Sequence, residues 1–241
     1  MITSKQNALI KEIRSLSDKK NRDILCQYIV EGIKPVLEAI ALGVKARAVL
    51  CTEKAENVLP QGVEKIVVSD EVFKSISEEK TPQGVLGVFY KPNNLVEKVK
   101  GSVVLLDGVS DPANVGAIIR TAAASGYNTV YLTEDSADAY SQKAVRASMS
   151  CIFRVKVIRS DIDTILSTID KKIVVADMHG TNVFESKIKD EFCLVIGNEG
   201  RGVSDKLKAL ADITVSIPMQ NGVESLNAAV SAGILMYNLK A

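Results

Sequence analysis

A glycine-rich stretch with one carboxylate, residues 197–202 (GNEGRG), directly follows an apolar segment that we predict to be a β-strand. Glycines at such a point let the backbone pass close to a ligand or to another segment. Their spacing matches neither the dinucleotide fingerprint G-x-G-x-x-G nor a phosphate-binding P-loop. Because Glu199 would repel a phosphate group, the stretch suits a ligand with hydroxyls, an amine or a sulfonium centre. A plain strand-to-helix turn with Glu199 near the helix N-terminus explains it equally well.

A second candidate is Arg120, a cation within the alanine-rich and otherwise mostly apolar residues 112–124. Asp111 and Pro112 predict the first turn of a helix there. Small and apolar neighbours predict that this helix is largely buried, and a buried guanidinium needs an anionic partner. That partner is either an internal carboxylate or a ligand. Asn114 lies about 240° from Arg120 around such a helix, so spacing does not place both on one face.

The third stretch, residues 213–239, combines a strand closed by Pro218, a turn at Asn221-Gly222 and a final helix. Ser225 is a candidate N-cap for that helix. The helix also contains small residues that let another backbone approach closely: Ala228, Ala229, Ala232 and Gly233. Packing in the core explains these small residues, and a subunit interface is the alternative.

The composition of the 241-residue chain is that of a soluble globular protein, with 46% apolar and 24% charged residues. No apolar run approaches the roughly 20 residues of a membrane span, and the N-terminus lacks a secretion signal. We therefore expect a cytoplasmic protein without membrane contact. The four cysteines are widely spaced, and His179 is the only histidine. We predict reduced, structural cysteines, a structural role for His179 and no metal site.

Net charge is +1, which argues against a strongly basic nucleic-acid binder. The first 22 residues nevertheless carry a local excess of positive charge. Lys5, Lys11 and Arg14 are the best candidates there for contacts with phosphate, although a solvated helix face explains them as well. A single helix is expected over residues 4–20, with Ser4 as its N-cap.

Predicted strands and helices alternate along the whole chain. Residues 91–101 are polar, contain Pro92, and are expected to link a small α/β domain (1–94) to a second domain (95–241). Several strands of the second domain are almost entirely apolar, which is typical of a parallel sheet covered by helices on both faces. Ligands of such sheets bind at the carboxyl ends of the strands, where residues 197–202 are expected to lie.

Three segments, in this order, resemble the motifs of the SpoU/TrmH branch of the SPOUT RNA methyltransferases. They are DPANVGAIIRTAAASG (111–126), LVIGNEGRGV (194–203) and SIPMQNGVESLNAAVSAGILMY (216–237). Residues 139–150 resemble the segment that the family places between its first two motifs. The N-terminal part, with SKQNALIKEIRSL and YIVEGIKPVLEAI, is similar to the family's small RNA-binding domain, which has a ribosomal-protein-like fold.

This resemblance implies methyl transfer from S-adenosylmethionine to a ribose 2′-hydroxyl of RNA. It also implies a homodimer formed through the C-terminal SPOUT domain and a trefoil knot at that domain's C-terminal end. Arg120 is implied as the catalytic residue, with Asn114, Glu199, Ser225 and Asn227 as supporting site residues. The cofactor-binding residues implied are Gly197, Asn198, Gly200, Ile217, Met219 and Leu226. The family usually reads S-L-N-V-S where this chain has Ala229 at the last position, so a hydroxyl common in the family is missing.

The sequence is compatible with more than one role for Arg120 and more than one substrate. A guanidinium with a pKa above about 12 is a poor base, so Arg120 acts either as a general base or as a charged clamp on the substrate. Large-subunit ribosomal RNA is the preferred substrate, by analogy with the family's two-domain members. Transfer RNA, a drug-resistance methylation of ribosomal RNA, and a non-catalytic RNA-binding or ribosome-assembly role are the alternatives. DNA is not expected as a substrate, because only RNA has the 2′-hydroxyl. A dinucleotide-dependent oxidoreductase is disfavoured by the glycine spacing.

Overall fold

The computed structural model describes residues 1–221 and 223–240; Gly222, expected in a turn with Asn221, lies outside them. The chain divides into two compact units, Met1–Asn93 with Tyr140–Phe153, and Asn94–Ala139 with Arg154–Ala241. Among the described residues, no helix is both long and apolar enough to cross a membrane.

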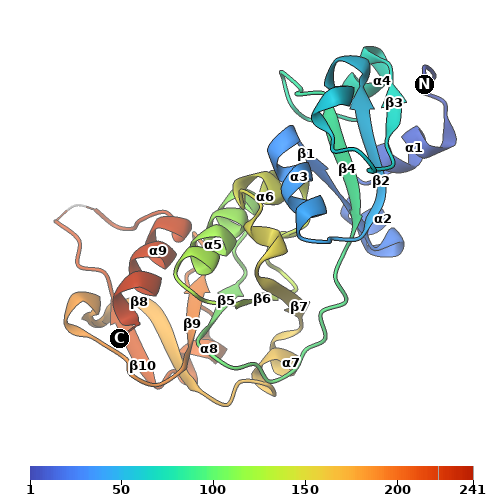
Figure 1. Ribbon diagram of the computed structural model, residues 1–241. Helices are drawn as coiled ribbons and strands as arrows, with labels where there is room; N and C mark the ends of the chain where they lie inside the picture. The colour runs from blue at the N-terminus through green and yellow to red at the C-terminus, as the bar shows by residue number, and fades with distance from the viewer. Residues whose placement is uncertain (222, 241) are drawn as a thin grey trace. The chain divides into compact units, whose positions relative to one another are not determined.

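The first unit is a small α/β structure whose described strands form one mixed sheet in the order β1-β4-β2-β3. Strand β4 is antiparallel to β1 and β2, whereas β2 and β3 are parallel. Helices α1 and α4 contribute to the core on one face, and α3 contacts β1 and β4 (Figure 1). The elements are α1 (Ala8–Ser15), α2 (Lys19–Leu25), β1 (Gln27–Glu31), α3 (Ile33–Ala41), β2 (Ala46–Thr52), η1 (Glu53–Val58), β3 (Ile66–Val68), α4 (Asp70–Lys74), β4 (Val85–Tyr90), α6 (Gln142–Ala147) and η2 (Cys151–Phe153).

The single helix expected over residues 4–20 is wrong, because the segment forms two short helices. Asn7, and not Ser4, caps α1 by accepting a hydrogen bond from the Leu9 N–H over 2.9 Å. Asp18 caps α2 in the same way, accepting from the Lys20 N–H over 2.8 Å. An extended Asp18 therefore separates the two helices.

Residues 140–153 belong to the first unit, although they follow β6 in sequence and β6 belongs to the second unit. The ring of Tyr140 lies 4.9 Å from that of Tyr28 on β1, measured between centroids. Arg146 on α6 forms an ion pair with Glu79. The family-like segment 139–150 thus packs almost entirely with the first unit.

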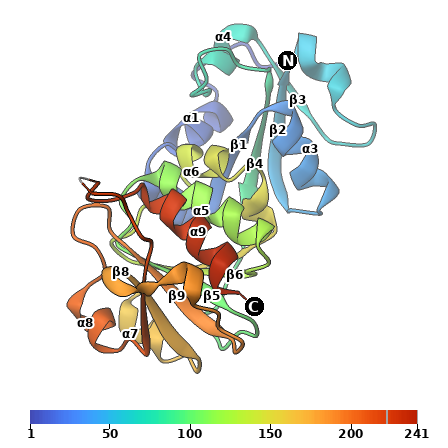
Figure 2. The same cartoon turned by 90° about the vertical axis from the view of Figure 1, so that its left-hand side faces the viewer.

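The second unit contains, within the described residues, a six-stranded sheet in the order β10-β8-β9-β5-β6-β7. All neighbouring strands are parallel, which confirms the predicted parallel sheet. Helices α5 and α9 lie on one face, and α7 and α8 lie on the other (Figure 2). The elements are β5 (Val103–Asp107), α5 (Pro112–Ala124), β6 (Thr129–Thr133), β7 (Lys156–Ser160), α7 (Ile162–Leu166), β8 (Lys172–Asn182), η3 (Val183–Glu185), β9 (Phe192–Gly197), α8 (Asp205–Ala209), β10 (Ile213–Ser216) and α9 (Ala228–Leu239).

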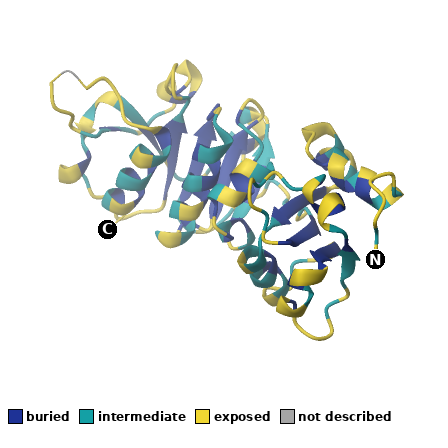
Figure 3. Ribbon diagram, turned by 90° about the horizontal axis from the view of Figure 1, so that it is seen from above, coloured by how far each residue is buried: buried dark blue, intermediate teal, exposed yellow. Residues whose placement is uncertain are grey.

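The central strands of this sheet are buried on both faces. Every residue of β5 and β6 is buried, and β9 is buried up to Ile196 (Figure 3). Uninterrupted apolar sequence is what such strands require, because helices cover both sides. Polar side chains therefore gather where the strands end.

Helix α5 begins as predicted, with Pro112 in its first turn and the Asp111 side chain accepting from the Ala113 N–H over 2.9 Å. Arg120, however, is exposed, so the expectation of a buried guanidinium is wrong for the single chain. The helix buries one face, which includes Asn114 and Ile118, and Arg120 lies outside it. Of its small neighbours, Ala124 is exposed and Ala117 and Ala123 are only partly buried, so they do not enclose the cation.

Helix α9 is capped by Asn227 and not by Ser225. The Asn227 side chain accepts from the N–H groups of Ala229, over 2.9 Å, and Val230, over 3.3 Å. Ala228 and Ala232 are buried within the chain, and α9 packs against α5. Ala228 and Ala232 therefore serve packing inside the unit.

Candidate functional site

Gly197 ends β9 at a point where two stretches of backbone meet. A Cβ atom at position 197 would lie 2.3 Å from the carbonyl carbon of Gly202 and from the nitrogen of Val203. The backbones of Asn198 and Gly202 exchange two hydrogen bonds of 3.0 Å, and Gly202 has a positive φ of 70°. The tight loop itself thus requires glycine at 197 and favours it at 202.

The side chain of Asn198 fixes this loop to the neighbouring strand end. Its Nδ2 donates to the Gly108 carbonyl over 2.7 Å, and its Oδ1 accepts from the N–H groups of Gly200 and Arg201. Arg201 in turn forms an ion pair with Asp135, beyond the end of β6. The loop is therefore anchored to the carboxyl ends of β5 and β6.

Glu199 reaches the start of α5 and accepts four hydrogen bonds there. Its carboxylate receives the Ser110 N–H (3.0 Å) and hydroxyl (2.8 Å), the Asp111 N–H (3.3 Å) and the Asn114 amide (2.8 Å). Partial burial raises the pKa of Glu199, but the hydrogen bonds from Asn114 and Ser110 outweigh it and lower the pKa to about 2. The side chain is thus ionised at neutral pH and is held in one place.

Asn114 joins this carboxylate to the start of α9. Its Nδ2 donates to Glu199, and its Oδ1 accepts from Nδ2 of Asn227 over 2.9 Å. Both ends of the Asn114 amide are used, and Asn114 is 8% exposed. Three residues from the three motif-like segments therefore form one hydrogen-bonded chain.

A cavity of about 410 Å³ opens beside this chain, at the carboxyl ends of β8, β9 and β10. It is lined by residues 176–179, 196–202, 208, 215–217, 219, 224–226, 228, 231 and 235. All six residues predicted to bind the cofactor line it: Gly197, Asn198, Gly200, Ile217, Met219 and Leu226. Glu199 and Ser225 also line it. Asn114 and Asn227 are tied to its edge through Glu199, whereas Arg120 is not part of its wall.

Sequence reasoning missed several residues around this cavity. Ser110 supplies two of the donors to Glu199, and Asp177 and Lys208 form an ion pair in the cavity wall. His179, interpreted from sequence as structural, is exposed and lines the cavity. A usable signal was present, because polar residues follow the apolar run of β8 at Asp177.

The basic residues Lys5, Lys11 and Arg14 all lie in the first unit and are exposed. Arg14 donates to the Ser75 hydroxyl over 3.1 Å, which holds it against the segment that follows α4. Lys5 precedes α1, and Lys11 lies on α1. Their exposure leaves them accessible to a polyanion.

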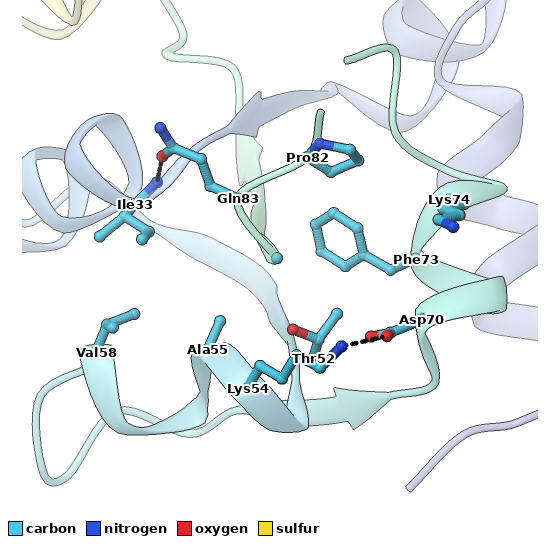
Figure 4. A pocket seen from close by; sticks show the side chains of 11 residues that line it. Ile33, Thr52, Lys54, Ala55, Val58, Asp70, Phe73, Lys74, Pro82 and Gln83 are labelled. Atoms are coloured by element: carbon cyan, nitrogen blue, oxygen red, sulfur yellow. Dashed lines mark hydrogen bonds and ion pairs between the residues drawn. The ribbon is translucent and has the colours of Figure 1, made fainter. Parts of the chain in front are cut away.

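A separate cavity of about 280 Å³ lies within the first unit (Figure 4). Lys54 and Asp70 form an ion pair of 3.1 Å at its edge, and Gln83 accepts from the Ile33 N–H over 2.9 Å. Phe73 lies between these two contacts (Figure 4). This cavity contains none of the residues predicted from the motifs.

Comparison with known proteins gives the chain a family. Residues 101–237 match the model of the SpoU rRNA Methylase family. The chain belongs to this family. In addition, residues 7–87 match the MRM3-like substrate binding domain, which agrees with the expected two-domain SpoU arrangement.

Individual SpoU relatives span nearly the whole chain. The 23S rRNA (guanosine(2553)-2′-O)-methyltransferase RlmP of Bacillus subtilis is 30% identical over 99% of this chain and 98% of its own length. The SpoU methyltransferase AviRb of Streptomyces viridochromogenes, solved in complex with AdoMet, has a TM-score of 0.86 and 28% identity, over 97% of each chain. An AdoMet-bound rRNA methyltransferase of Sinorhizobium meliloti has a TM-score of 0.84 and 28% identity, over 98% of this chain and 95% of its own.

Proposed function

We propose that this SpoU-family protein transfers a methyl group from S-adenosylmethionine to a ribose 2′-hydroxyl of ribosomal RNA. The observation that carries the proposal is the cavity at the strand ends, in whose wall the glycine loop meets the segment before α9. Relatives named as 23S rRNA 2′-O-methyltransferases, from Bacillus subtilis and Streptomyces species, support ribosomal RNA over transfer RNA. A drug-resistance methylation of the same RNA is the alternative within this class of substrate.

The residues present fit S-adenosylmethionine. Ile217, Leu226 and Leu235 give the wall apolar surface for an adenine ring. Glu199 and Glu224 supply negative charge for a sulfonium or an amine, and they disfavour a phosphate-bearing cofactor. Gly197, Asn198 and Gly200 bring backbone close to the ligand. The first task of these residues is therefore to bind the donor and to orient it for the reaction.

When bound, the donor supplies a methyl group on a sulfonium, which is already a good leaving group, so no metal is required. The chain must hold the ribose hydroxyl in line and stabilise the charge that develops on its oxygen. Arg120 is proposed for this role, as a charged clamp or as the group that takes the proton. Asn114, Glu199 and Asn227 support it by holding α5, the glycine loop and the start of α9 together. Ser225 supports it from the cavity wall.

We include a homodimer, formed through the C-terminal domain, in the proposal. Val230 and Tyr237 are both more than half exposed and lie seven residues apart on α9, so they share one helix face. Such apolar surface is typical of an interface. Because α9 packs on α5, a partner on this face would lie beside the helix that carries Arg120, which is exposed and outside the cavity of the single chain.

The two domains divide the work between them. Residues 1–94 bind the RNA, with Lys5, Lys11 and Arg14 as phosphate contacts, and residues 95–241 form the SPOUT methyltransferase domain. The trefoil knot and a cytoplasmic location are proposed with them. The match of residues 7–87 to a substrate-binding domain supports this division.

Two experiments test the proposed function. Calorimetry on the full chain should detect S-adenosylmethionine binding with one site per chain. Mapping of ribose methylation in cells lacking the gene should then reveal one lost mark in large-subunit ribosomal RNA. If the chain does not bind the donor, it is a non-catalytic RNA-binding or ribosome-assembly factor. If the lost mark lies in transfer RNA, then transfer RNA and not ribosomal RNA is the substrate.

A further inference from the structure

The pairing between strands β8 and β10 is interrupted over five residues of β8, beside the cavity. Val175 pairs with Thr214, yet the next residue of β10, Val215, pairs with Thr181. Residues 176–180 of β8 therefore have no counterpart and bulge out of the pairing; we call them the β8 bulge. Four of the five, residues 176–179, line the cavity of the glycine loop. Bulges of this kind commonly re-aim side chains next to active sites.

The base of the β8 bulge is closed by backbone contact. A Cβ atom at Gly180 would lie 2.5 Å from the carbonyl carbon of Val215, so the two strands meet more closely there than any other residue type allows. The Ser216 hydroxyl donates to the Gly180 carbonyl over 2.8 Å, and the Thr181 hydroxyl donates to the Thr214 carbonyl over 3.2 Å. The β8 bulge is thus a defined part of the fold.

Within the β8 bulge, Asp177 is held by two contacts. Lys208 on α8 lies 2.8 Å from Oδ2, and the His179 N–H donates to Oδ1 over 3.1 Å. The Asp177 side chain is 18% exposed. Each carboxylate oxygen has received one donor, and a carboxylate has about four acceptor positions in all. Acceptor capacity therefore remains on a side chain that lines the cavity.

The ion pair with Lys208 decides which ligand group can bind to the remaining acceptor positions of the Asp177 carboxylate. A second cation, such as the amine or the sulfonium of the donor, would approach Lys208 closely and be repelled by it. Neutral hydroxyl groups donate to a carboxylate without that repulsion. Two adjacent hydroxyls match its two oxygens, as an acidic side chain binds ribose in dinucleotide-binding folds.

We propose that Asp177 binds the ribose hydroxyls of the adenosyl group in the donor cavity, with Lys208 as its positioning residue. This inference rests on the proposed function, since it requires that the cavity holds S-adenosylmethionine. It assigns the β8 bulge, which lies outside the three motif-like segments, to recognition of the donor's sugar. It also separates the two ends of the donor, with the sugar at β8 and the sulfonium toward Glu199.

The test is calorimetry on the full chain with S-adenosylhomocysteine and with its 2′-deoxy and 3′-deoxy analogues. Wild type should bind at least one deoxy analogue about 10- to 100-fold more weakly, the value of a hydrogen bond to a charged group. Asp177→Ala should bind S-adenosylhomocysteine more weakly than wild type does, by a similar factor. It should bind that deoxy analogue as tightly as wild type does, so the preference for S-adenosylhomocysteine over the analogue disappears. Asp205→Ala, which removes an exposed carboxylate of α8 outside the cavity, is the matched control and should keep the wild-type preference.

The outcomes separate this inference from the function on which it rests. Equal affinity of wild type for all three compounds overturns the role of Asp177 and leaves the proposed function intact. A wild-type preference that persists in Asp177→Ala does the same. If wild type binds none of the compounds, the proposed function fails and the inference fails with it. The comparison within wild type stands even where Asp177→Ala does not fold.

Discussion

The amide of Asn227 donates to the amide oxygen of Asn114 over 2.9 Å, and this single contact connects residues 113 positions apart. Because Asn114 also donates to Glu199, its orientation is fixed from both ends. Asn227 uses its own oxygen to cap α9. The start of α9, the start of α5 and the glycine loop are therefore positioned together.

Replacing Asn114 with alanine should destabilise the protein by about 1–3 kcal/mol, because two polar partners lose their hydrogen bonds at a nearly buried site. Urea unfolding at neutral pH measures this change. Asn128→Ala is the matched control, since Asn128 is an exposed residue and should change the free energy of unfolding by less than about 0.5 kcal/mol. Equal stability of the two variants would show that the amide chain is not a stabilising contact.

Glu199 gives a pH dependence whose sign follows from its lowered pKa. Folding lowers the pKa from the ordinary 4.5 to about 2, so its contribution to stability is fully present above about 4.5. That contribution is lost as the pH falls from about 4.5 toward 2. The difference in free energy of unfolding between wild type and Glu199→Gln should therefore shrink over this interval. A difference that grows on acidification would contradict the ionised state of Glu199.

Gly197→Ala should damage the glycine loop, since the added Cβ would meet backbone atoms at 2.3 Å that cannot move independently. We expect a loss of about 1–3 kcal/mol in stability, as for other overpacked sites, together with weaker donor binding. Gly200→Ala is the control for stability, because its Cβ would meet only the Asn198 side chain, at 3.6 Å. Thermal unfolding that ranks the two variants in the opposite order would refute this account of the loop.

Arg120→Ala should lower turnover by about 100-fold or more, as removal of a group that stabilises developing charge does. Its affinity for S-adenosylhomocysteine should stay that of wild type, because Arg120 lies outside the cavity wall. Arg120→Lys then separates the two roles: retained activity favours the charged clamp, since lysine keeps the charge. Unchanged turnover in Arg120→Ala would remove this residue from the mechanism.

The proposed dimer predicts that Val230→Asp lowers the molecular mass measured by sedimentation equilibrium to that of one chain. An aspartate at the centre of an apolar interface is left desolvated and unpaired, which opposes association. Ile24→Asp, at an exposed apolar residue of the first unit, should leave the mass unchanged. A wild-type protein that sediments as a monomer would contradict the dimer directly.

Local signals in the sequence were sufficient for most elements of the second unit. The continuous apolar strands predicted the parallel sheet, and Asp111 with Pro112 predicted the start of α5. The resemblance to the family's motifs also brought residues 197–200 together with residues 217–226, which share one cavity wall. Such features depend on neighbours in sequence or on the order of the strands.

Features that depend on distant partners were not predictable. Ser225 and Asn227 are both good caps, and α9 uses Asn227, which also reaches Asn114. The apolar composition around Arg120 did not reveal which face of α5 is covered. The β8 bulge is a property of register against β10, and no local pattern in the sequence of β8 encodes it.

The central claim is that the cavity beside the glycine loop holds the methyl donor, and a crystal structure of the protein soaked with S-adenosylmethionine tests it most directly. The account predicts the adenosyl group between Gly197, Ile217 and Leu226, in a domain whose chain is knotted. Density for the donor at any other place on the molecule, with this cavity left empty, would contradict it.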